Sequence, residues 1–191
     1  GACDRHFGVG GDGIALIEQS DIADAKIRLF NADGSESATA GNALRCMAKY
    51  LYDNHIVRKE EMTIETDKGT KTVRVYTTDG RVTSACVDMG YATLDTTALH
   101  LNIPERQVVD YPVEIGGQSW NITCVDMGNP HCVVFCSRVD GVDVARIGPQ
   151  FEHAPYFPDR INTEFIRVVN PSTIKMRVWE RGSGETLACG T

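Results

Sequence analysis

The sequence has no long apolar run, no surplus of basic residues and no CxxC pair. No run approaches the ~18 apolar residues of a membrane-spanning helix. The 19 Lys and Arg residues are scattered and outnumbered by 26 Asp and Glu residues, which gives a formal net charge of -7. Neither a membrane nor nucleic acid is therefore an expected partner. The polar opening GACDRH shows no signal peptide, which favours a cytoplasmic protein, although a trimmed N-terminus would look the same.

The cysteines give no sign of a disulfide framework or a metal site. They number 7, an odd count, and most lie in apolar runs such as HCVVFC. Buried thiols in a reducing compartment explain this pattern better than disulfides do. A zinc site at His131, Cys132 and Cys136 is disfavoured, because on a strand the two cysteines share one face and His131 takes the other. We therefore predict no bound metal.

The 191 residues, 42% of them hydrophobic, suffice for one large domain or two small ones. Apolar spacing predicts a helix from about Gly41 to Asn54 and a short helix within residues 141–154. Residues 97–108 are irregular and link the two halves. Strands are predicted at residues 14–18, 26–30, 62–66, 71–78, 81–89, 111–115, 119–127, 131–136, 164–169 and 172–180. Strand runs with one helix in each half predict an α+β fold.

The two halves carry an internal repeat. One ungapped alignment matches Lys26 with Lys175, Arg28 with Arg177, Glu36 with Glu185, Gly41 with Gly190, and Ala40 with Cys189. Each half then ends a strand in a polar loop and begins a helix at Ala-Gly or Cys-Gly. Chance similarity between two strand–turn–helix units is the alternative. We expect two half-domains, residues 1–91 with the Ala40 loop and residues 92–191 with the Cys189 loop.

The glycine-rich run GVGGDG, Gly8–Gly13, matches the G-x-G-x-x-G pattern of dinucleotide sites. Such a site needs an apolar strand before the glycines and a helix after them. Here the polar CDRH precedes the run and the strand-like IALIE follows it. We therefore reject a nucleotide site and predict a tight glycine turn.

Cys189 is the strongest candidate for chemistry. The repeat places it at a helix N-terminus, where partial positive charge and unpaired N–H groups favour a thiolate. Gly190 and Thr191 would form an anion cradle at this helix end, and Gly41 and Asn42 would form its partner in the first half. The alternative is that Cys189 is only a small buried apolar residue.

Three more side chains near these loops have two readings each. His131, which follows an Asn-Pro pair, is either a histidine satisfied at a strand edge or, beside a thiol, a proton acceptor. Glu180 and Arg181 stand at the strand end that enters the cysteine loop. They form either a solvated ion pair or a site for the ammonium and carboxylate of an amino acid.

Taken together, these segments resemble the diaminopimelate epimerase family. The matching segments are CDRHFGVGGDG, FNADGSE with GNALRC, VDMGNPHCV, RINTEFI and WERGSGETLACGT, and they span almost the whole chain. The resemblance implies two pseudo-symmetric domains, each a mixed, mostly antiparallel sheet curled around a central helix, with substrate between them. It implies an isomerase of LL- and meso-diaminopimelate in lysine and peptidoglycan biosynthesis that needs no cofactor. A homodimer is the expected assembly, although the sequence does not determine it.

The resemblance also implies roles for individual residues. In this family one thiolate removes the α-proton, a second thiol protonates the opposite face, and two helix N-termini stabilise the carboxylate. Cys189 matches one of the two thiols, and Glu180 and His131 match the groups that tune them. The remaining matches are Asn31, Asn129, Asn162 and Arg181 for the distal end of the substrate, and Gly41, Asn42, Gly190 and Thr191 for its carboxylate.

Two departures from the family pattern have consequences. The family has a cysteine at the position of Ala40, and because a methyl group carries no exchangeable proton, we predict that this sequence does not epimerise. A deliberate cysteine-to-alanine change explains Ala40 most simply, and a natural one-cysteine relative is the alternative. The family's opening segment is absent and the sequence stops at Thr191, which indicates a truncated and poorly stable chain.

Three other functions remain open at this point. The first is a racemase or epimerase of another amino acid on the same fold. The second is a relative that binds an amino acid without turning it over. The third is a structural β-rich protein, which would leave the glycine-flanked Cys189 and the paired loops unexplained.

Overall fold

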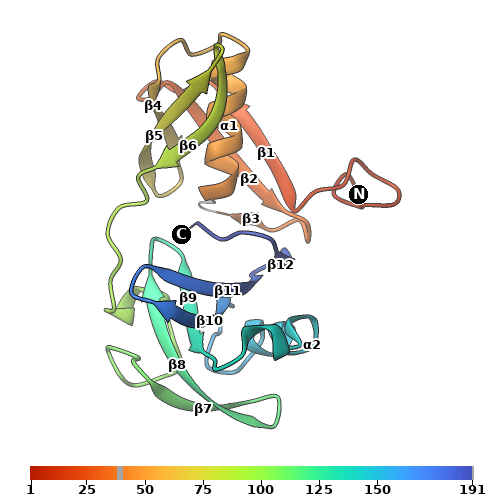
Figure 1. Cartoon of the computed structure of the whole chain (residues 1–191), viewed down its shortest axis with the longest axis vertical. Helices are drawn as coiled ribbons and strands as arrows, with labels where there is room; N and C mark the ends of the chain where they lie inside the picture. The colour runs from red at the N-terminus through yellow and green to blue at the C-terminus, as the bar shows by residue number, and fades with distance from the viewer. Residues whose placement is uncertain (38–40, 191) are drawn as a thin grey trace. The chain divides into compact units, whose positions relative to one another are not determined.

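The computed structural model describes residues 1–37 and 41–190, which Figure 1 colours from the N-terminus to the C-terminus. They group into two compact units. The first comprises Gly1–Gly90 with the chain end from Gly190, and the second comprises Tyr91–Cys189. Each unit has its own six-stranded mixed sheet and its own α-helix. This confirms the predicted α+β class with two mixed sheets, while the division at residue 91 into domains stays a prediction.

The first unit is a mostly antiparallel sheet with one helix against it. Its strands are β1 (Gly13–Glu18), β2 (Ala25–Asn31), β3 (Glu36–Ser37), β4 (Glu61–Thr66), β5 (Gly69–Thr78) and β6 (Arg81–Val87). They run in the order β1-β2-β4-β5-β6, with β3 also paired to β2, and only β2 and β4 are parallel. Helix α1 (Gly41–Asp53) packs against β5 and β6. It buries Leu44, Met47, Ala48 and Leu51, as the apolar spacing predicted.

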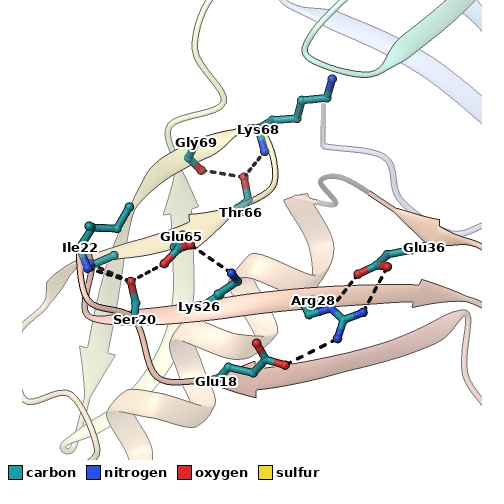
Figure 2. A network of polar contacts seen from close by, with 11 residues as sticks. Glu18, Ser20, Ile22, Lys26, Arg28, Glu36, Glu65, Thr66, Lys68 and Gly69 are labelled. Atoms are coloured by element: carbon teal, nitrogen blue, oxygen red, sulfur yellow. Dashed lines mark hydrogen bonds and ion pairs between the residues drawn. The ribbon is translucent and has the colours of Figure 1, made fainter.

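Polar side chains tie β2 to its neighbours (Figure 2). Arg28 donates from Nε and Nη2 to the two Glu36 oxygens, at 2.8 and 3.3 Å, and so links β2 to β3. Lys26 Nζ lies 3.2 Å from Glu65 Oε1 on β4, and Ser20 Oγ donates to Glu65 Oε2 at 2.5 Å. The hydrogen bond from Arg28 lowers the pKa of Glu36, and those from Ser20 and Lys26 lower the pKa of Glu65. Both carboxylates are therefore charged at neutral pH.

The second unit also has one parallel strand pair in an otherwise antiparallel sheet. Its strands are β7 (Tyr111–Ile115), β8 (Gln118–Asp126), β9 (Pro130–Phe135), β10 (Asn162–Asn170), β11 (Thr173–Glu180) and β12 (Gly184–Thr186). They run in the order β12-β11-β10-β9-β8-β7, and the parallel pair is β9 with β10. Helix α2 (Val144–Glu152) packs against β10, β11 and β12. Two 3₁₀ turns, η1 (Thr96–Leu99) and η2 (Val139–Gly141), complete the unit.

Every predicted strand and both predicted helices are present, with ends that match or are shifted by at most three residues. The short strands β3 and β12 were not predicted, because two or three residues are too few to show an alternating pattern. The Gly8–Gly13 run is a turn, as expected. Gly10 has φ +80°, Gly8 N–H donates to Asp4 O at 2.9 Å, and β1 rather than a helix follows. Across the described part of the chain, no helix is long and apolar enough to cross a membrane.

The internal repeat is visible as two matching three-strand modules. Strands β1, β2 and β3 pair in the same order and register as β10, β11 and β12. The matched partners are Phe30 with Ile14 and Glu36 in the first module, and Trp179 with Thr163 and Glu185 in the second. These residues are related by the same alignment that matched Ala40 with Cys189.

An ion pair repeats with the strands. Arg28 Nε lies 2.8 Å from Glu36 Oε1 in the first module, and Arg177 Nε lies 2.8 Å from Glu185 Oε1 in the second. Shared register and a shared ion pair rule out chance similarity between the halves. The repeat is a structural duplication of a strand–strand–loop module.

Each unit has its own buried core. The first is built around Leu44, Met62 and Ile64, and the second around Phe151 and Phe165. These two rings and Trp120 form a T-shaped cluster, with centroids 5.4 to 6.0 Å apart. Because side chains alternate along a strand, burying Phe165 in this core directs the residues next to it in β10 to the opposite face. The candidate site lies on that opposite face.

Candidate functional site

The predicted site residues divide between the two units, except that Ala40 and Thr191 lie outside the described residues. The first unit holds Asn31, Gly41 and Asn42, and the second holds Asn129, His131, Asn162, Glu180, Arg181 and Cys189. Gly190 groups with the first unit. The arrangement in each unit is described separately.

In the first unit the predicted residues lie at the end of β2 and the start of α1. The Asn31 side chain donates to Ser35 Oγ at 3.0 Å, and Asn31 lines a hollow of ≈ 360 Å³ together with Cys3. Gly41 is the first residue of α1 and is buried, and the next residue, Asn42, accepts a hydrogen bond from Arg45. The first N–H groups of a helix have no partner within it and favour an anion. The carboxylate cradle at this helix end stays a prediction.

The second unit has three polar side chains on one face of the parallel pair β9 and β10, two neighbouring strands that Figure 1 labels. His131 pairs with Asn162 across the two strands, and Glu164 lies two residues further along β10. All three are buried, and His131 is only 3% exposed. The strand-edge interpretation of His131 is wrong, because β9 lies between β8 and β10.

Both ring nitrogens of His131 face an oxygen atom. Nδ1 lies 2.7 Å from Glu164 Oε1, and Nε2 lies 3.0 Å from Asn129 Oδ1. An imidazolium, which donates from both nitrogens, satisfies both contacts. A neutral imidazole with its proton on Nδ1 also satisfies both contacts if the Asn129 amide is rotated by 180°, so that its NH₂ group donates to Nε2. The nitrogen and oxygen of an amide have nearly the same shape, so both orientations fit the same position. In either form His131 donates to the Glu164 carboxylate.

Cys189 completes the cluster. Its Sγ donates to Glu164 Oε1 at 3.8 Å, and the ligand atoms of Cys189, Glu164 and His131 lie within 4.8 Å of one another. A metal ion would need a similar spacing, but His131 Nδ1 and Glu164 Oε1 are already hydrogen-bonded to each other. We therefore describe the three as a hydrogen-bonded cluster in which a thiol lies beside a carboxylate and an imidazole.

The helix expected to begin after Cys189 falls on Thr191 and beyond, outside the described residues, so it stays a prediction. Residues 188–190 are irregular. Within the described part of the chain, the Glu164 carboxylate accepts a hydrogen bond from this thiol. Sequence reasoning did not single out Glu164. The available signal was its spacing of two from Asn162 on a strand, which puts both side chains on one face.

Glu180 and Arg181 do not form the ion pair considered from the sequence. Glu180 Oε1 accepts a hydrogen bond from Thr186 Oγ1 at 2.5 Å, which links the ends of β11 and β12. The Arg181 guanidinium donates to the Asp159 carbonyl at 3.0 Å and, among the described residues, has no carboxylate partner within ion-pair distance. Its burial, and then the charge of Arg160, lower the pKa of Arg181, although an arginine remains protonated at neutral pH.

Asn162 has a structural contact on each side of its amide. Nδ2 donates to Pro130 O at 2.8 Å, and Oδ1 accepts from the Arg181 N–H at 2.9 Å. Asn162 therefore fixes the start of β9 and the backbone that carries Arg181. One amide hydrogen and one lone pair remain for a ligand.

The prediction of buried thiols is confirmed for Cys124 and Cys132 and is wrong for Cys46 and Cys86, which are exposed. All seven are thiols, and Cys124 and Cys132 are fully buried in the second core. Burial raises the pKa of Cys132 well above its usual range, with further contributions from Cys124 and the charge of Glu164. Neither thiol is suited to act as a nucleophile or base.

Comparison with known proteins gives consistent matches to one family. The sequence model of the diaminopimelate epimerase family matches residues 1–94 and 123–191. The chain is 50% identical to diaminopimelate epimerase of Desulfovibrio desulfuricans, with 98% of the chain and 68% of that protein aligned. It is 48% identical to the enzyme of that name from Pelotomaculum thermopropionicum, with 99% and 68% aligned.

Solved structures with low sequence identity share the fold. A probable proline racemase from Agrobacterium radiobacter superposes with a TM-score of 0.69 at 15% identity. A hydroxyproline epimerase from Agrobacterium vitis superposes with a TM-score of 0.67 at 14% identity. Each alignment covers 92% of this chain and 56% of the other. The likeness supports the architecture of two curled mixed sheets and, at this identity, nothing beyond it.

Proposed function

The chain belongs to the diaminopimelate epimerase family, and from this premise we propose that its site moves a proton at the α-carbon of diaminopimelate. The reaction interconverts the LL and meso forms, without a cofactor, for lysine and peptidoglycan synthesis. The observation that carries the proposal is the cluster of Cys189, Glu164 and His131, with a thiol beside a proton-accepting network. A reducing compartment such as the cytoplasm suits an enzyme that depends on a thiol.

The proposed mechanism uses Cys189 at one face of the α-carbon. Its S–H bond breaks as a C–H bond forms on the carbanion, and sulfur keeps the electron pair. Helix α1 begins at Gly41, and the positive end of its dipole would stabilise the negative charge that develops on the substrate carboxylate. Glu180 remains a proposed tuning group, although its observed contact is with Thr186.

The distal end of the substrate is the second element of the proposal. Arg181 is a half-buried cation without an ion-pair partner among the described residues, so a ligand carboxylate would satisfy it. Asn129 and Asn162 lie beside it on the strand ends, and Asn31 is the proposed contribution of the first unit. A substrate with an amino-acid group at each end fits this set of side chains. Racemisation of another amino acid is the alternative, to be tested with a panel of amino acids.

We also propose that the sequence with Ala40 is inactive. Epimerisation needs one proton acceptor and one proton donor on opposite faces, and a methyl group can be neither. Cys189 alone reaches only one face of the α-carbon and therefore cannot invert it. The family cysteine at this position supports a lost function rather than a different mechanism.

The test is α-proton exchange of LL-diaminopimelate in deuterated water, followed by NMR, for the Ala40 protein and for Ala40→Cys. We expect exchange and formation of the meso isomer with Ala40→Cys only. Cys189→Ser in the same background should abolish both, whereas Cys46→Ala, at an exposed thiol on α1, should not. Epimerisation by the Ala40 protein would overturn the proposed inactivity. Binding without exchange in both forms would identify a relative that binds the amino acid without turning it over.

The homodimer stays a prediction, which sedimentation analysis can test.

A further inference from the structure

The carboxylate nearest to Cys189 belongs to Glu164, a residue for which the proposed mechanism provides no role. Glu164 is 6% exposed and lies on the central strand β10. Its Oε1 accepts hydrogen bonds from two proton-carrying side chains, Cys189 at 3.8 Å and His131 at 2.7 Å. A buried carboxylate that accepts from a thiol and an imidazole affects the protonation of both.

The second oxygen of Glu164 gives independent evidence that this group is more than a structural anchor. Oε2 is buried and accepts no hydrogen bond from any described residue. Buried polar atoms are normally paired, and an unpaired carboxylate oxygen is costly. Replacing Glu164 with an apolar side chain would remove that cost, so stability alone does not explain a carboxylate here.

The repeat shows that this carboxylate is confined to the second module. In the shared register, Glu164 pairs with Val178 and the equivalent residue Ala15 pairs with Leu29. The first module therefore has a methyl group where the second has a carboxylate. Two thiols placed by these modules would meet different electrostatic environments, although the strands that position them are alike.

We propose that Glu164 is a positioning residue that holds Cys189 in the protonated thiol form and fixes the orientation of His131. A thiolate at Cys189 would place a second negative charge next to the buried carboxylate, whereas a thiol donates a hydrogen bond to it. His131, donating to the same oxygen, compensates the carboxylate charge. Cys189 is thus the resting proton donor, and in Ala40→Cys the thiol of the first module would be the resting base. The assignment of donor and base rests on the proposed function, but the protonation of Cys189 does not.

Other charged groups around the cluster do not offset this effect. Cys132, on the opposite face of β9, is uncharged because burial raises its pKa. Glu180, at the end of β11, adds negative charge to the region and accepts from Thr186. The Arg181 guanidinium donates to the Asp159 carbonyl. Among the described residues of this unit, His131 makes the shorter of the two hydrogen bonds to Glu164 Oε1.

The experiment measures the alkylation of Cys189 by iodoacetamide as a function of pH, by mass spectrometry of the peptide that contains it. Only the thiolate reacts, so the pH midpoint reports the protonation of this sulfur. Glu164→Gln removes the charge and keeps the shape and an acceptor for His131. We expect its Cys189 midpoint to fall by about one pH unit or more. Glu164→Asp keeps the charge, so its Cys189 midpoint should lie closer to that of the unsubstituted protein.

Two sets of controls isolate the effect. Cys46 and Cys86 are exposed, and their midpoints should be the same in every variant. Glu114→Gln removes one charge from an exposed position on β7, at the far edge of the sheet, and should leave Cys189 unchanged. An unchanged or higher Cys189 midpoint in folded Glu164→Gln would overturn the proposal.

A second measurement needs no variant and therefore does not depend on folding of Glu164→Gln. In the unsubstituted protein, proton NMR should show a downfield, slowly exchanging signal from the His131 Nδ1–H bonded to Glu164. Absence of this NMR signal, together with alkylation of Cys189 at a low pH midpoint, would contradict the proposal. Because both readouts are independent of diaminopimelate, they can succeed even if the protein fails to exchange the α-proton.

Discussion

At the scale of single residues, the difference between Glu164 and Ala15 shows that the two halves of the internal repeat share a backbone register but differ in side-chain chemistry. The backbone register is the same around both positions, yet only one supplies a carboxylate. A reaction that removes a proton from one face and adds one to the other needs two groups in opposite protonation states. A single side-chain difference on a duplicated scaffold can provide this asymmetry.

Arg181 gives the residue-scale prediction for ligand binding. Arg181→Met removes the guanidinium but keeps an apolar chain, so a bound diaminopimelate would lose its charge-assisted hydrogen bonds. We expect the Kd measured by calorimetry to rise about 10- to 100-fold. Arg167→Met, at an exposed position on β10, is the matched control and should bind normally. Equal affinities for both variants would remove Arg181 from the site.

At the scale of elements, helix α2 holds the strand end that carries Glu180 and Arg181. Trp179 Nε1 on β11 donates to Glu152 Oε2 on α2 at 2.7 Å. The other Glu152 oxygen accepts from Gly182 N–H at 3.0 Å and lies 3.2 Å from Arg160. One buried carboxylate thus fixes the helix end, the strand and the turn before β12. The loop with Cys189 follows directly from this anchored turn.

Gly148 gives the element-scale prediction, because it allows α2 to lie directly against Trp179. A Cβ at Gly148 would overlap the indole ring of Trp179, closer than real contacts allow. Gly148→Ala should force the helix and the indole apart and lower the free energy of unfolding by about 1–3 kcal/mol, measured by urea denaturation. Gly141→Ala is the control, since its Cβ would meet Arg138 at an ordinary 4.0 Å. Unchanged stability of Gly148→Ala would mean that this packing is loose.

At the scale of the whole molecule, the two units have cores that share no residue. The first core draws on residues between Ala25 and Val87, and the second on residues between Leu99 and Trp179. Each core is formed by side chains from the sheet and the helix of its own unit. Such separation allows one unit to lose stability while the other keeps its packing.

Hydrogen exchange tests this separation. Leu44→Ala removes a fully buried side chain from the first core and should cost about 2–5 kcal/mol there. We expect amides of β4 and β5 to exchange faster, while amides of β8 and β9 change little. Phe165→Ala, in the second core, should give the reverse pattern. Equal loss of protection in both units for each variant would show that the chain unfolds as one cooperative body.

Much of this organisation could be predicted from local patterns. The α1 helix follows from apolar residues such as Leu44 and Leu51 at helical spacing, and the strands follow from alternation. The repeat and its register follow from matched residues such as Arg28 and Arg177. Two-residue strands such as Glu36–Ser37 escaped prediction because their formation depends on a partner strand more than on their own sequence.

The sequence by itself determined the family and the duplicated module, because each depends on which residue stands at which position. Only the tertiary structure brought Glu164 against Cys189. His131 and Glu164 are 33 positions apart and meet because β9 and β10 pair in parallel. Spacing along a chain fixes which face a side chain occupies, but pairing between distant strands fixes its neighbours. A buried charge and its partners are therefore a property of the fold.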